Sequence, residues 1–200
     1  MPKIIAVSGG IAVGKTTFGN RIGHELQGAY FVQENPEQNP FLEDFYKDRT
    51  RWSFHSRIGM LDLFEQRMKA IPGDIDVIVL DRTIHELIVF ADLQLRNGTM
   101  SQKEYDLYKS VFETYCTLMP VPDILIRVTC DEEVALERMH SRGRSFEQKI
   151  GLEYLRAVEK EYDRWFAGLT LRSTIITVRT DREIDLRDLL TQVGGGSLDK

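Results

Sequence analysis

Short apolar segments alternate along the chain with longer segments in which apolar residues recur at every third or fourth position. The short segments are rich in β-branched residues and end at glycine, proline or charged residues, as is typical of buried strands. They predict five strands, at residues 3–8, 30–32, 76–80, 123–129 and 173–178. Because helical segments separate the strands, each connection is a crossover. The pattern therefore predicts an α/β fold with a mostly parallel sheet that helices cover on both faces.

The longer segments predict helices, because their apolar residues fall on one face of a helix. The predicted helices cover about residues 18–26, 41–70 in one or two pieces, 84–95, 105–118, 131–139, 152–165 and 183–190. Asp131 stands where the N-cap of the helix after the fourth strand is expected. No internal repeat and no long linker divides the chain. We therefore expect a single domain over residues 1–193, followed by a flexible glycine-rich tail over 194–200.

The charge balance narrows the class of partner. The 200 residues include 26 Lys and Arg and 31 Asp and Glu, a formal net charge of −5 at pH 7. Such a chain has no general attraction for a nucleic-acid backbone or an anionic membrane, so we expect neither as a partner. No apolar run approaches the roughly 20 residues of a membrane helix, and the N-terminus lacks the pattern of a signal peptide. With only Cys116 and Cys130 and no CxxC pair, we expect a cytoplasmic protein without a disulfide framework.

Residues 9–16, with the sequence GGIAVGKT, match the phosphate-binding pattern G-x-x-x-x-G-K-[ST] between a predicted strand and a predicted helix. In such a loop backbone N–H groups surround phosphate oxygens, Lys15 supplies a positive charge and the Thr16 hydroxyl supplies a ligand for Mg²⁺. The positive end of the helix that starts here points at the same anion. The pattern predicts a nucleoside triphosphate bound by Gly9, Gly10, Ile11, Ala12, Val13, Gly14, Lys15, Thr16 and Thr17. The alternative is a chance glycine turn between a strand and a helix.

The rest of the chain restricts the class of nucleotide-binding protein. A small GTPase would carry the guanine-reading pattern N-K-x-D, which the sequence lacks, and a motor or AAA-type ATPase usually needs a longer chain. A kinase for a small substrate fits 200 residues. Such an enzyme also needs a base for the acceptor hydroxyl and mobile cations that close over the transferred phosphoryl group.

Two carboxylates and an arginine stand at predicted strand ends. Glu34 follows the second strand, and Asp81 and Arg82 follow the third. Ligands of parallel sheets bind beyond the carboxyl ends of the strands, so these residues should meet the phosphate loop at one edge. Glu34 could take a proton from an acceptor hydroxyl, and Asp81 stands where a Walker B carboxylate would. The alternatives are a solvated loop glutamate for Glu34 and a cap of the following helix for Asp81.

Arg138, Arg142 and Arg144 cluster around Gly143. A lid over phosphate requires several guanidinium groups beside a glycine hinge, so we expect an arginine-rich lid over about residues 138–149. The alternative is a solvated basic helix end, which the helix dipole favours. Glu147, just beyond the arginines, is either a ligand group or a counter-charge for them.

The order of these motifs resembles the deoxynucleoside kinase family, which includes the deoxycytidine, deoxyguanosine and deoxyadenosine kinases. The resemblance covers about residues 3–180 and rests on GGIAVGKTT, QENPEQNPFLEDFYKDRTRWSFH, DRT after a strand, RMHSRGRSFEQ and LEYLRAVEKEYDRW. It implies a three-layer P-loop kinase fold with five parallel strands, ATP with Mg²⁺ as phosphoryl donor, and a deoxynucleoside as acceptor. It also implies a homodimer through the helices around 41–70 and 84–118.

The resemblance implies roles for residues near the phosphates. Glu34 matches the family's general base for the 5′-hydroxyl, and Arg82 matches the arginine that holds this base. With Lys15 they form the expected catalytic set. Asp81 matches the acidic residue near Mg²⁺, so the expected metal site consists of Thr16, Asp81 and Glu34.

Further roles concern the acceptor. Tyr46 and Glu147 match the pair that hydrogen-bonds the 3′-hydroxyl of the sugar. The lid arginines of the family are matched by Arg138, Arg142 and Arg144. Trp52, Phe54 and Phe112 could line the base pocket, and plain core packing is the alternative for each of them.

The positions that read the nucleobase depart from the family's pattern. Arg57 stands where the family usually has a glutamine, and Phe64 where many members have an arginine. An arginine only donates, and its fork suits two adjacent acceptors such as guanine O6 and N7. We therefore expect a purine of the guanine type, or another base that bears an oxygen acceptor. Two alternatives stay open: Arg57 turns to solvent while Gln66 or another residue reads the base, or Arg57 contacts a phosphate of a nucleotide acceptor.

These expectations describe a kinase that transfers the γ-phosphoryl group of ATP to the 5′-hydroxyl of a deoxynucleoside. Catalysis of this type depends on positioning and electrostatics, so it depends on Glu34 being held at the acceptor. The alternatives are a nucleoside monophosphate kinase or a modified-base kinase on the same scaffold, and a regulator that binds a nucleotide without turnover.

Overall fold

A five-stranded sheet forms the centre of the computed structural model, which describes residues 2–194. Its strands are β1 (Lys3–Ser8), β2 (Ala29–Val32), β3 (Val77–Asp81), β4 (Ile124–Thr129) and β5 (Thr174–Arg179). They lie in the order β2-β3-β1-β4-β5, and every neighbouring pair is parallel. The predicted α/β fold with a parallel sheet is therefore confirmed, and the bounds of each strand lie within one residue of the predicted range.

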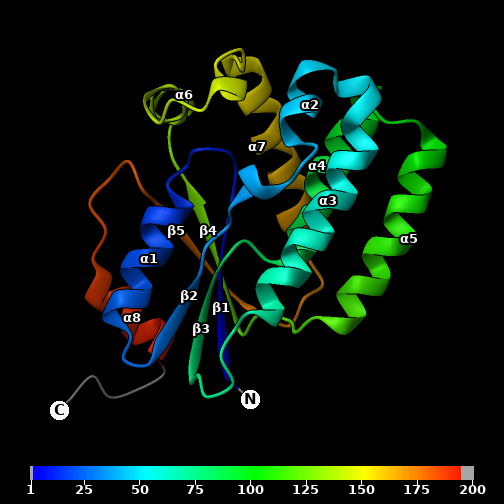
Figure 1. The fold of residues 1–200 in the computed structure, drawn as a ribbon. Coiled ribbons are helices and arrows are strands. Elements are labelled where there is room, and N and C mark those ends of the chain that lie inside the picture. Colours follow the sequence, from blue (N-terminus) through cyan, green and yellow to red (C-terminus); the bar gives the residue numbers. More distant parts are fainter. Residues whose placement is uncertain (1, 195–200) are drawn as a thin grey trace.

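Helices cover both faces of the sheet (Figure 1). They are α1 (Lys15–Glu25), α2 (Leu42–Lys47), α3 (Arg49–Lys69), α4 (Leu87–Arg96), α5 (Gln102–Leu118), α6 (Glu132–Ser141), α7 (Leu152–Ala167) and α8 (Leu186–Gly194). Short 3₁₀ turns lie at Pro36–Gln38, Ile84–Glu86 and Ser145–Glu147. α1 and α8 pack on one face and α3, α4 and α5 on the other, which gives the three layers of the expected P-loop kinase fold.

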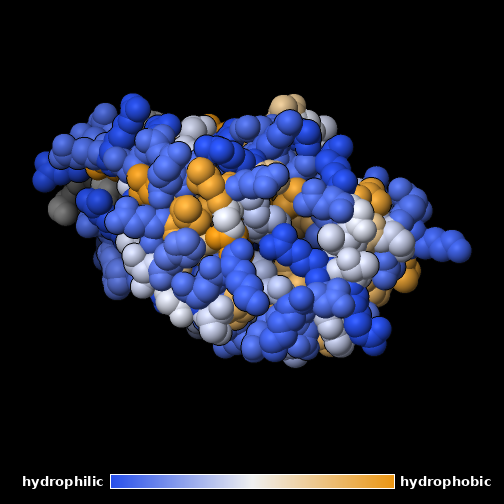
Figure 2. Space-filling model, turned by 90° about the horizontal axis from the view of Figure 1, so that it is seen from above, coloured by the Kyte–Doolittle hydropathy of each residue, from blue (hydrophilic) through white to orange (hydrophobic). Residues whose placement is uncertain are grey.

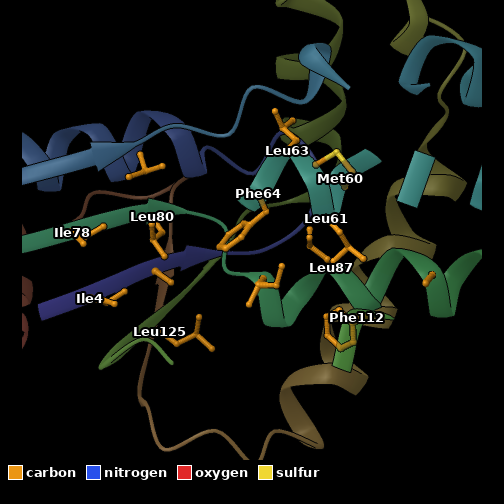
Figure 3. Packing of buried hydrophobic residues seen from close by; sticks show 14 of the residues in the cluster. Ile4, Met60, Leu61, Leu63, Phe64, Ile78, Leu80, Leu87, Phe112 and Leu125 are labelled. Atoms are coloured by element: carbon orange, nitrogen blue, oxygen red, sulfur yellow. The ribbon is translucent and has the colours of Figure 1, made fainter. Parts of the chain in front are cut away.

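Alternate residues of the strands build the two halves of the core. On β1, Ile4 and Ala6 pack with α3, α4 and α5, whereas Ile5 and Val7 pack with α1 and α8. Phe64 of α3 belongs to the first of these clusters and is 2% exposed (Figure 3). The position that carries an arginine in many deoxynucleoside kinases is therefore a packing position in this chain.

Asp48 and Asp131 precede helices α3 and α6, and of these two only Asp48 caps its helix with its side chain. Asp48 divides the predicted helix over 41–70, because its backbone is extended and its Oδ1 accepts a hydrogen bond from Arg51 N at 3.1 Å. Asp131 occupies the predicted N-cap position of α6, but its side chain makes no capping bond. Its Oδ1 accepts instead from Arg179 Nη2 at 2.5 Å, so an ion pair with β5 replaces the cap.

The last helix differs from its prediction at both ends. α8 spans Leu186–Gly194 rather than 183–190. Asp185 sets its start, since Asp185 Oδ1 accepts from the backbone N–H groups of Arg187 at 2.9 Å and Asp188 at 3.3 Å. Of the flexible tail predicted for 194–200, Gly194 ends α8 and residues 195–200 lie outside the described residues. None of the helices described within residues 2–194 is long and apolar enough to cross a membrane.

Candidate active site

A cavity of about 840 Å³ opens at the carboxyl ends of the strands. Its wall combines the phosphate loop, the end of β2, helices α2 to α4, the lid and the connection after β5. Figure 2 views the molecule from this end, where hydrophilic side chains border apolar ones. The predicted site residues that line the cavity are Ile11, Ala12, Gly14, Lys15, Thr16, Thr17, Glu34, Tyr46, Arg57, Arg82, Arg138, Arg142, Arg144 and Glu147. Segments far apart in the sequence thus meet in one space of the size that small ligands occupy.

The phosphate loop has a backbone that depends on its glycines. Gly9 (φ 147°) and Gly14 (φ 93°) lie in the left-handed region, and a Cβ on Gly9 would lie 2.2 Å from the carbonyl oxygen of Val128. Lys15 begins α1 and donates from Nζ to Gly10 O at 2.5 Å. Burial and the neighbouring Arg82 lower the pKa of Lys15 to about 8. Anionic phosphate beside this ammonium would favour its charged form.

Asp81 and Thr16 lie together at the base of the loop. Thr16 Oγ1 donates to Asp81 Oδ2 at 2.5 Å, and Asp81 Oδ1 is buried without a hydrogen-bond partner among the described residues. Burial and the nearby Glu34 raise the pKa of Asp81. The capping alternative for Asp81 is wrong, because Thr83 occupies the N-cap of the turn that follows.

This pair fits Mg²⁺. One hydroxyl and one carboxylate with an open oxygen suit an ion that takes most of its other ligands from phosphates and water. No cluster of three or more His, Cys, Asp or Glu residues within residues 2–194 could hold a metal ion without such help. The side chains present therefore match a metal that arrives with a nucleotide.

Glu34 and Arg82 form a buried ion pair. Arg82 Nε donates to Glu34 Oε2 at 2.6 Å, and the side chains are 5% (Arg82) and 12% (Glu34) exposed. Burial raises the pKa of Glu34, but the charges of Arg82, Lys15 and Arg67 outweigh this effect and hold it below its usual value. Glu34 is therefore an ionised carboxylate in the cavity wall, and the alternative of a solvated loop glutamate is wrong.

Each of the three lid arginines is hydrogen-bonded to a described residue. Arg138 donates to Thr180 Oγ1 at 2.9 Å and to Thr180 O at 3.0 Å. Arg142 donates to both oxygens of Glu147, and Arg144 Nη2 donates to Glu37 Oε2 at 2.9 Å. All three side chains line the cavity, although Arg142 is also exposed to solvent, so the lid over the phosphates stays a prediction.

The predicted sugar-binding pair comes together beside the lid. Glu147 is 3% exposed, and Tyr46 stacks on the neighbouring Phe146 with ring centroids 5.4 Å apart. Burial and the nearby Tyr154 and Glu147 raise the pKa of Tyr46, so its hydroxyl keeps its proton. The cavity thus offers one hydroxyl and one carboxylate from separate segments at the same wall.

Arg57 is buried in the cavity wall. It is 5% exposed, its Nη2 donates to Ser56 Oγ at 3.2 Å, and its Nε has no partner among the described residues. Its guanidinium carbon lies 5.2 Å from the ring centroid of Phe90 and 5.8 Å from that of Phe45. The alternative in which Arg57 turns to solvent is wrong. Gln66 is exposed and donates to Asp62 Oδ2 at 2.7 Å, so it does not read a base.

The other aromatic candidates lie outside the cavity lining. Trp52 stacks on Phe41 with ring centroids 5.7 Å apart, and Phe112 stacks on Tyr108 in the core. Phe54 packs against the same core cluster. Contact of these three aromatics with a base therefore stays a prediction, while the packing of Phe54 and Phe112 in the core is observed.

The cavity also contains residues that the sequence did not single out. Phe45, Phe90, Tyr154 and Met60 line it, and Arg67 lies close enough to influence the pKa of Glu34. Tyr154 falls within the LEYLRAVEKEYDRW motif and Phe45 within QENPEQNPFLEDFYKDRTRWSFH, and these motifs were their only signals. The other residues lie on helices, where apolar residues that face the core and those that face the cavity recur at the same intervals along the sequence.

Comparison with known proteins finds deoxynucleoside kinases both by sequence and by fold. The sequence pattern described as deoxynucleoside kinase matches residues 5–193. The deoxyadenosine/deoxycytidine kinase of Bacillus subtilis is 36% identical over 168 residues, which cover 82% of this chain and 77% of that protein. The deoxyguanosine kinase of the same bacterium is 28% identical over 183 residues, which cover 88% of this chain and 84% of that protein.

A solved structure with the same fold is the deoxyadenosine kinase of M. mycoides with bound dATP. It matches with a TM-score of 0.82 and 25% sequence identity, over 96% of this chain and all of that chain (100%). The fold is therefore shared across the whole sheet and its helices. The bases named for these three relatives differ, so they do not indicate one base for this chain.

Proposed function

The chain belongs to the deoxynucleoside kinase family, whose members phosphorylate a hydroxyl group, and we propose that it transfers the γ-phosphoryl group of ATP to the 5′-hydroxyl of a deoxynucleoside. One observation carries this proposal. Arg82 joins Glu34 to the phosphate loop, since Nε donates to Glu34 Oε2 at 2.6 Å and Nη1 donates to Gly9 O at 3.1 Å. One guanidinium thus fixes a base relative to a phosphate site, as transfer between two bound substrates requires.

Glu34 is the general base of the proposed reaction. Its carboxylate takes the proton of the 5′-hydroxyl while that oxygen attacks the γ-phosphorus, and the bond from this phosphorus to the β–γ bridging oxygen breaks, so that ADP leaves. The arginines and Lys15 around it keep it ionised, so it is ready to accept a proton at neutral pH. Arg82 and Lys15 then offset the negative charge of the transferred group.

Mg²⁺ would be held by Thr16, Asp81 and Glu34. When bound with ATP, the ion neutralises charge on the phosphates. Asp81 would contribute Oδ1, which has no partner among the described residues, while its Oδ2 accepts a hydrogen bond from the Thr16 hydroxyl. The lid arginines Arg138, Arg142 and Arg144 would cover the phosphates from the opposite side.

The acceptor is bound between α2, α3 and the lid. The hydroxyl of Tyr46 and the carboxylate of Glu147 are suited to the 3′-hydroxyl of the sugar. Phe45 and Phe90 supply flat apolar surfaces for a base, and the guanidinium of Arg57, which lies over both rings, supplies cationic donors beside them. A deoxyguanosine-type base, with O6 and N7 as adjacent acceptors, satisfies the unpartnered Nε of Arg57 best.

A homodimer is part of the proposal. α5 exposes Leu107 (56%) and Leu118 (74%), which are large apolar side chains on one helix. Burial of this helix against a second copy would remove them from water. Sedimentation equilibrium should give twice the chain mass, and a monomer at assay concentrations would contradict this point.

The acceptor panel is the experiment that tests the proposal. ADP release from ATP and Mg²⁺ is measured with each of the four deoxynucleosides and each of their 5′-monophosphates, and the product is identified by mass spectrometry. We expect release that requires a deoxynucleoside, is fastest with deoxyguanosine, and yields its 5′-monophosphate. Turnover only with monophosphates would instead make the chain a nucleotide kinase. ATP binding without release in any mixture would make it a regulator.

A further inference from the structure

Arg82 adopts a conformation that needs support from the surrounding structure. Its φ is +71°, in the left-handed region that residues other than glycine rarely enter. Its side chain is nevertheless buried and makes hydrogen bonds from two nitrogens. Nε is used for Glu34, and Nη1 is shared by Gly9 O, Glu86 and Tyr162. Three acceptors, one carbonyl oxygen and two side chains, therefore surround one nitrogen. The proposed function gives none of these three groups a contact with substrate.

Glu86 is a second carboxylate for this arginine. It is fully buried (0% exposed), and its Oε1 lies 3.4 Å from Arg82 Nη1. Its other oxygen accepts a hydrogen bond from the hydroxyl of Ser8, the last residue of β1. Burial raises the pKa of Glu86, and Arg82 and Lys15 oppose that rise. A carboxylate is retained in such a place only when a fixed cation and hydrogen bonds satisfy it.

Tyr162 holds the same nitrogen from a different layer. It lies on α7 and is 0% exposed, with its ring edge-on to Phe90 and Trp165 at centroid distances of 6.2 and 6.3 Å. Its hydroxyl is hydrogen-bonded to Arg82 Nη1. The β1 strand, the turn after β3 and α7 therefore all fix the position of one guanidinium.

Arg82 Nη2 is left without a hydrogen bond to any described residue. The guanidinium is planar, so fixing Nε and Nη1 also fixes the direction of the Nη2 donors. Arg82 lines the cavity next to the phosphate loop. The free donors are thus available to an anionic group that enters there.

We propose that Glu86 and Tyr162 are positioning residues that fix Arg82 Nη1, so that Nε holds Glu34 at the acceptor hydroxyl and Nη2 faces the transferred phosphoryl group. This inference rests on the proposed roles of Glu34 and Arg82. The effect of Glu86 and Tyr162 is on the chemical step, because both act through the guanidinium and neither reaches a substrate. If the guanidinium were free to move, both the Glu34 carboxylate and the Nη2 donors that face the phosphoryl group would be misplaced.

The first test is Glu86→Gln, which keeps the shape and removes the charge. We expect kcat to fall roughly 10- to 100-fold, while the KM for ATP changes less than about twofold because the phosphate loop is intact. Glu161→Gln is the matched control. Glu161 is also a buried carboxylate (4% exposed) paired with two arginines, but it does not line the cavity, so kcat should stay at the wild-type value.

The same substitutions in the Arg82→Lys variant distinguish an effect on the position of the guanidinium from a general effect on the fold. In Arg82→Lys, which lacks the fork, Glu86→Gln should cost less than about twofold further, because it can no longer act through the guanidinium. Tyr162→Phe removes only the hydroxyl and should lower kcat about tenfold in the wild type and not in Arg82→Lys. A wild-type kcat in Glu86→Gln, or an equal loss in both backgrounds, would overturn the proposal.

If Glu86→Gln does not fold, Tyr162→Phe tests the proposal by the same two results: the loss of kcat in the wild type and the absence of that loss in Arg82→Lys. The wild-type rate with a deoxynucleoside tests the proposed function, whereas the ratio of variant to wild type tests the positioning of Arg82. The two conclusions can therefore fail separately. Circular dichroism of each variant ensures that folded proteins are compared.

Discussion

Arg142 donates two hydrogen bonds to the Glu147 carboxylate, from Nε at 2.7 Å and from Nη2 at 2.6 Å. Glu147 is buried in the cavity wall, and Arg142 follows the last residue of α6 in the lid. A parallel pair of this kind fixes both the distance and the plane of the two groups. The position of the lid is therefore coupled to a carboxylate that we assign to the sugar.

Arg142→Ala should raise the KM for the deoxynucleoside and lower kcat, each by roughly tenfold, because it frees the lid and leaves the buried Glu147 with only the longer ion pair to Arg144, at 3.6 Å. Steady-state kinetics with both substrates measures the two effects. Arg156→Ala is the matched control, since Arg156 pairs with Glu132 at 2.7 Å on the surface and is 55% exposed. Equal kinetics for the two variants would show that the Arg142–Glu147 pair has no part in acceptor binding.

Arg57→Gln should shift the base preference. Glutamine donates and accepts, so it can pair with the amino group of adenine or cytosine, which an arginine cannot. We expect the ratio of kcat/KM for deoxyguanosine to that for deoxyadenosine to fall by about 10- to 100-fold. Competition between the two deoxynucleosides in one reaction measures the ratio directly. An unchanged ratio would mean that Arg57 does not read the base.

Asp81→Asn should raise the concentration of Mg²⁺ needed for half-maximal rate and lower kcat by about 100-fold, because the open oxygen loses its charge. A Mg²⁺ titration at saturating ATP measures both. Asp92→Asn is a suitable control, because Asp92 does not line the cavity and its Oδ1 accepts a hydrogen bond from the Tyr105 hydroxyl at 2.6 Å. The same Mg²⁺ dependence in Asp81→Asn and the wild type would remove Asp81 from the metal site.

His85 should make the protein less stable in acid. Burial lowers the pKa of His85 to about 4 from 6.5, so the folded state binds fewer protons than the unfolded state between these values. The free energy of unfolding contributed by His85 is therefore present above pH 6.5 and is lost as the pH falls towards 4, by about 2 kcal/mol at pH 4.5. Urea unfolding of the wild type and His85→Asn at pH 7.5 and 4.5 measures the difference. If His85→Asn lost as much free energy of unfolding between pH 7.5 and 4.5 as the wild type, His85 would not be the cause of the acid sensitivity.

The fold was predictable because its signals are local. Five β-branched runs with helical segments between them admit only crossover connections, and the phosphate loop marks the first of these. Glu34 and Asp81 could be placed because a strand end puts a side chain at the carboxyl edge of a parallel sheet whatever lies around it.

Side-chain partners across the chain were not predictable. Asp131 pairs with Arg179, a residue 48 positions away, and no local pattern reveals this partner. Phe90 and Phe112 both sit at helical spacing, but only Phe90 lines the cavity, because the face that a helix presents depends on the packing of its neighbours. Glu86 reads as an ordinary helix-start glutamate until the fold brings Ser8 and Arg82 to it.

The central claim is that Glu34 is the base for the acceptor hydroxyl, and Glu34→Gln tests it most directly. The variant keeps the size of the side chain and an acceptor for Arg82 but cannot take a proton at neutral pH. Single-turnover phosphoryl transfer from ATP to the preferred deoxynucleoside is measured beside the Kd for ATP. We predict a rate at least about 100-fold below that of the wild type, with the Kd for ATP within about twofold. A wild-type rate of transfer in Glu34→Gln would contradict the account.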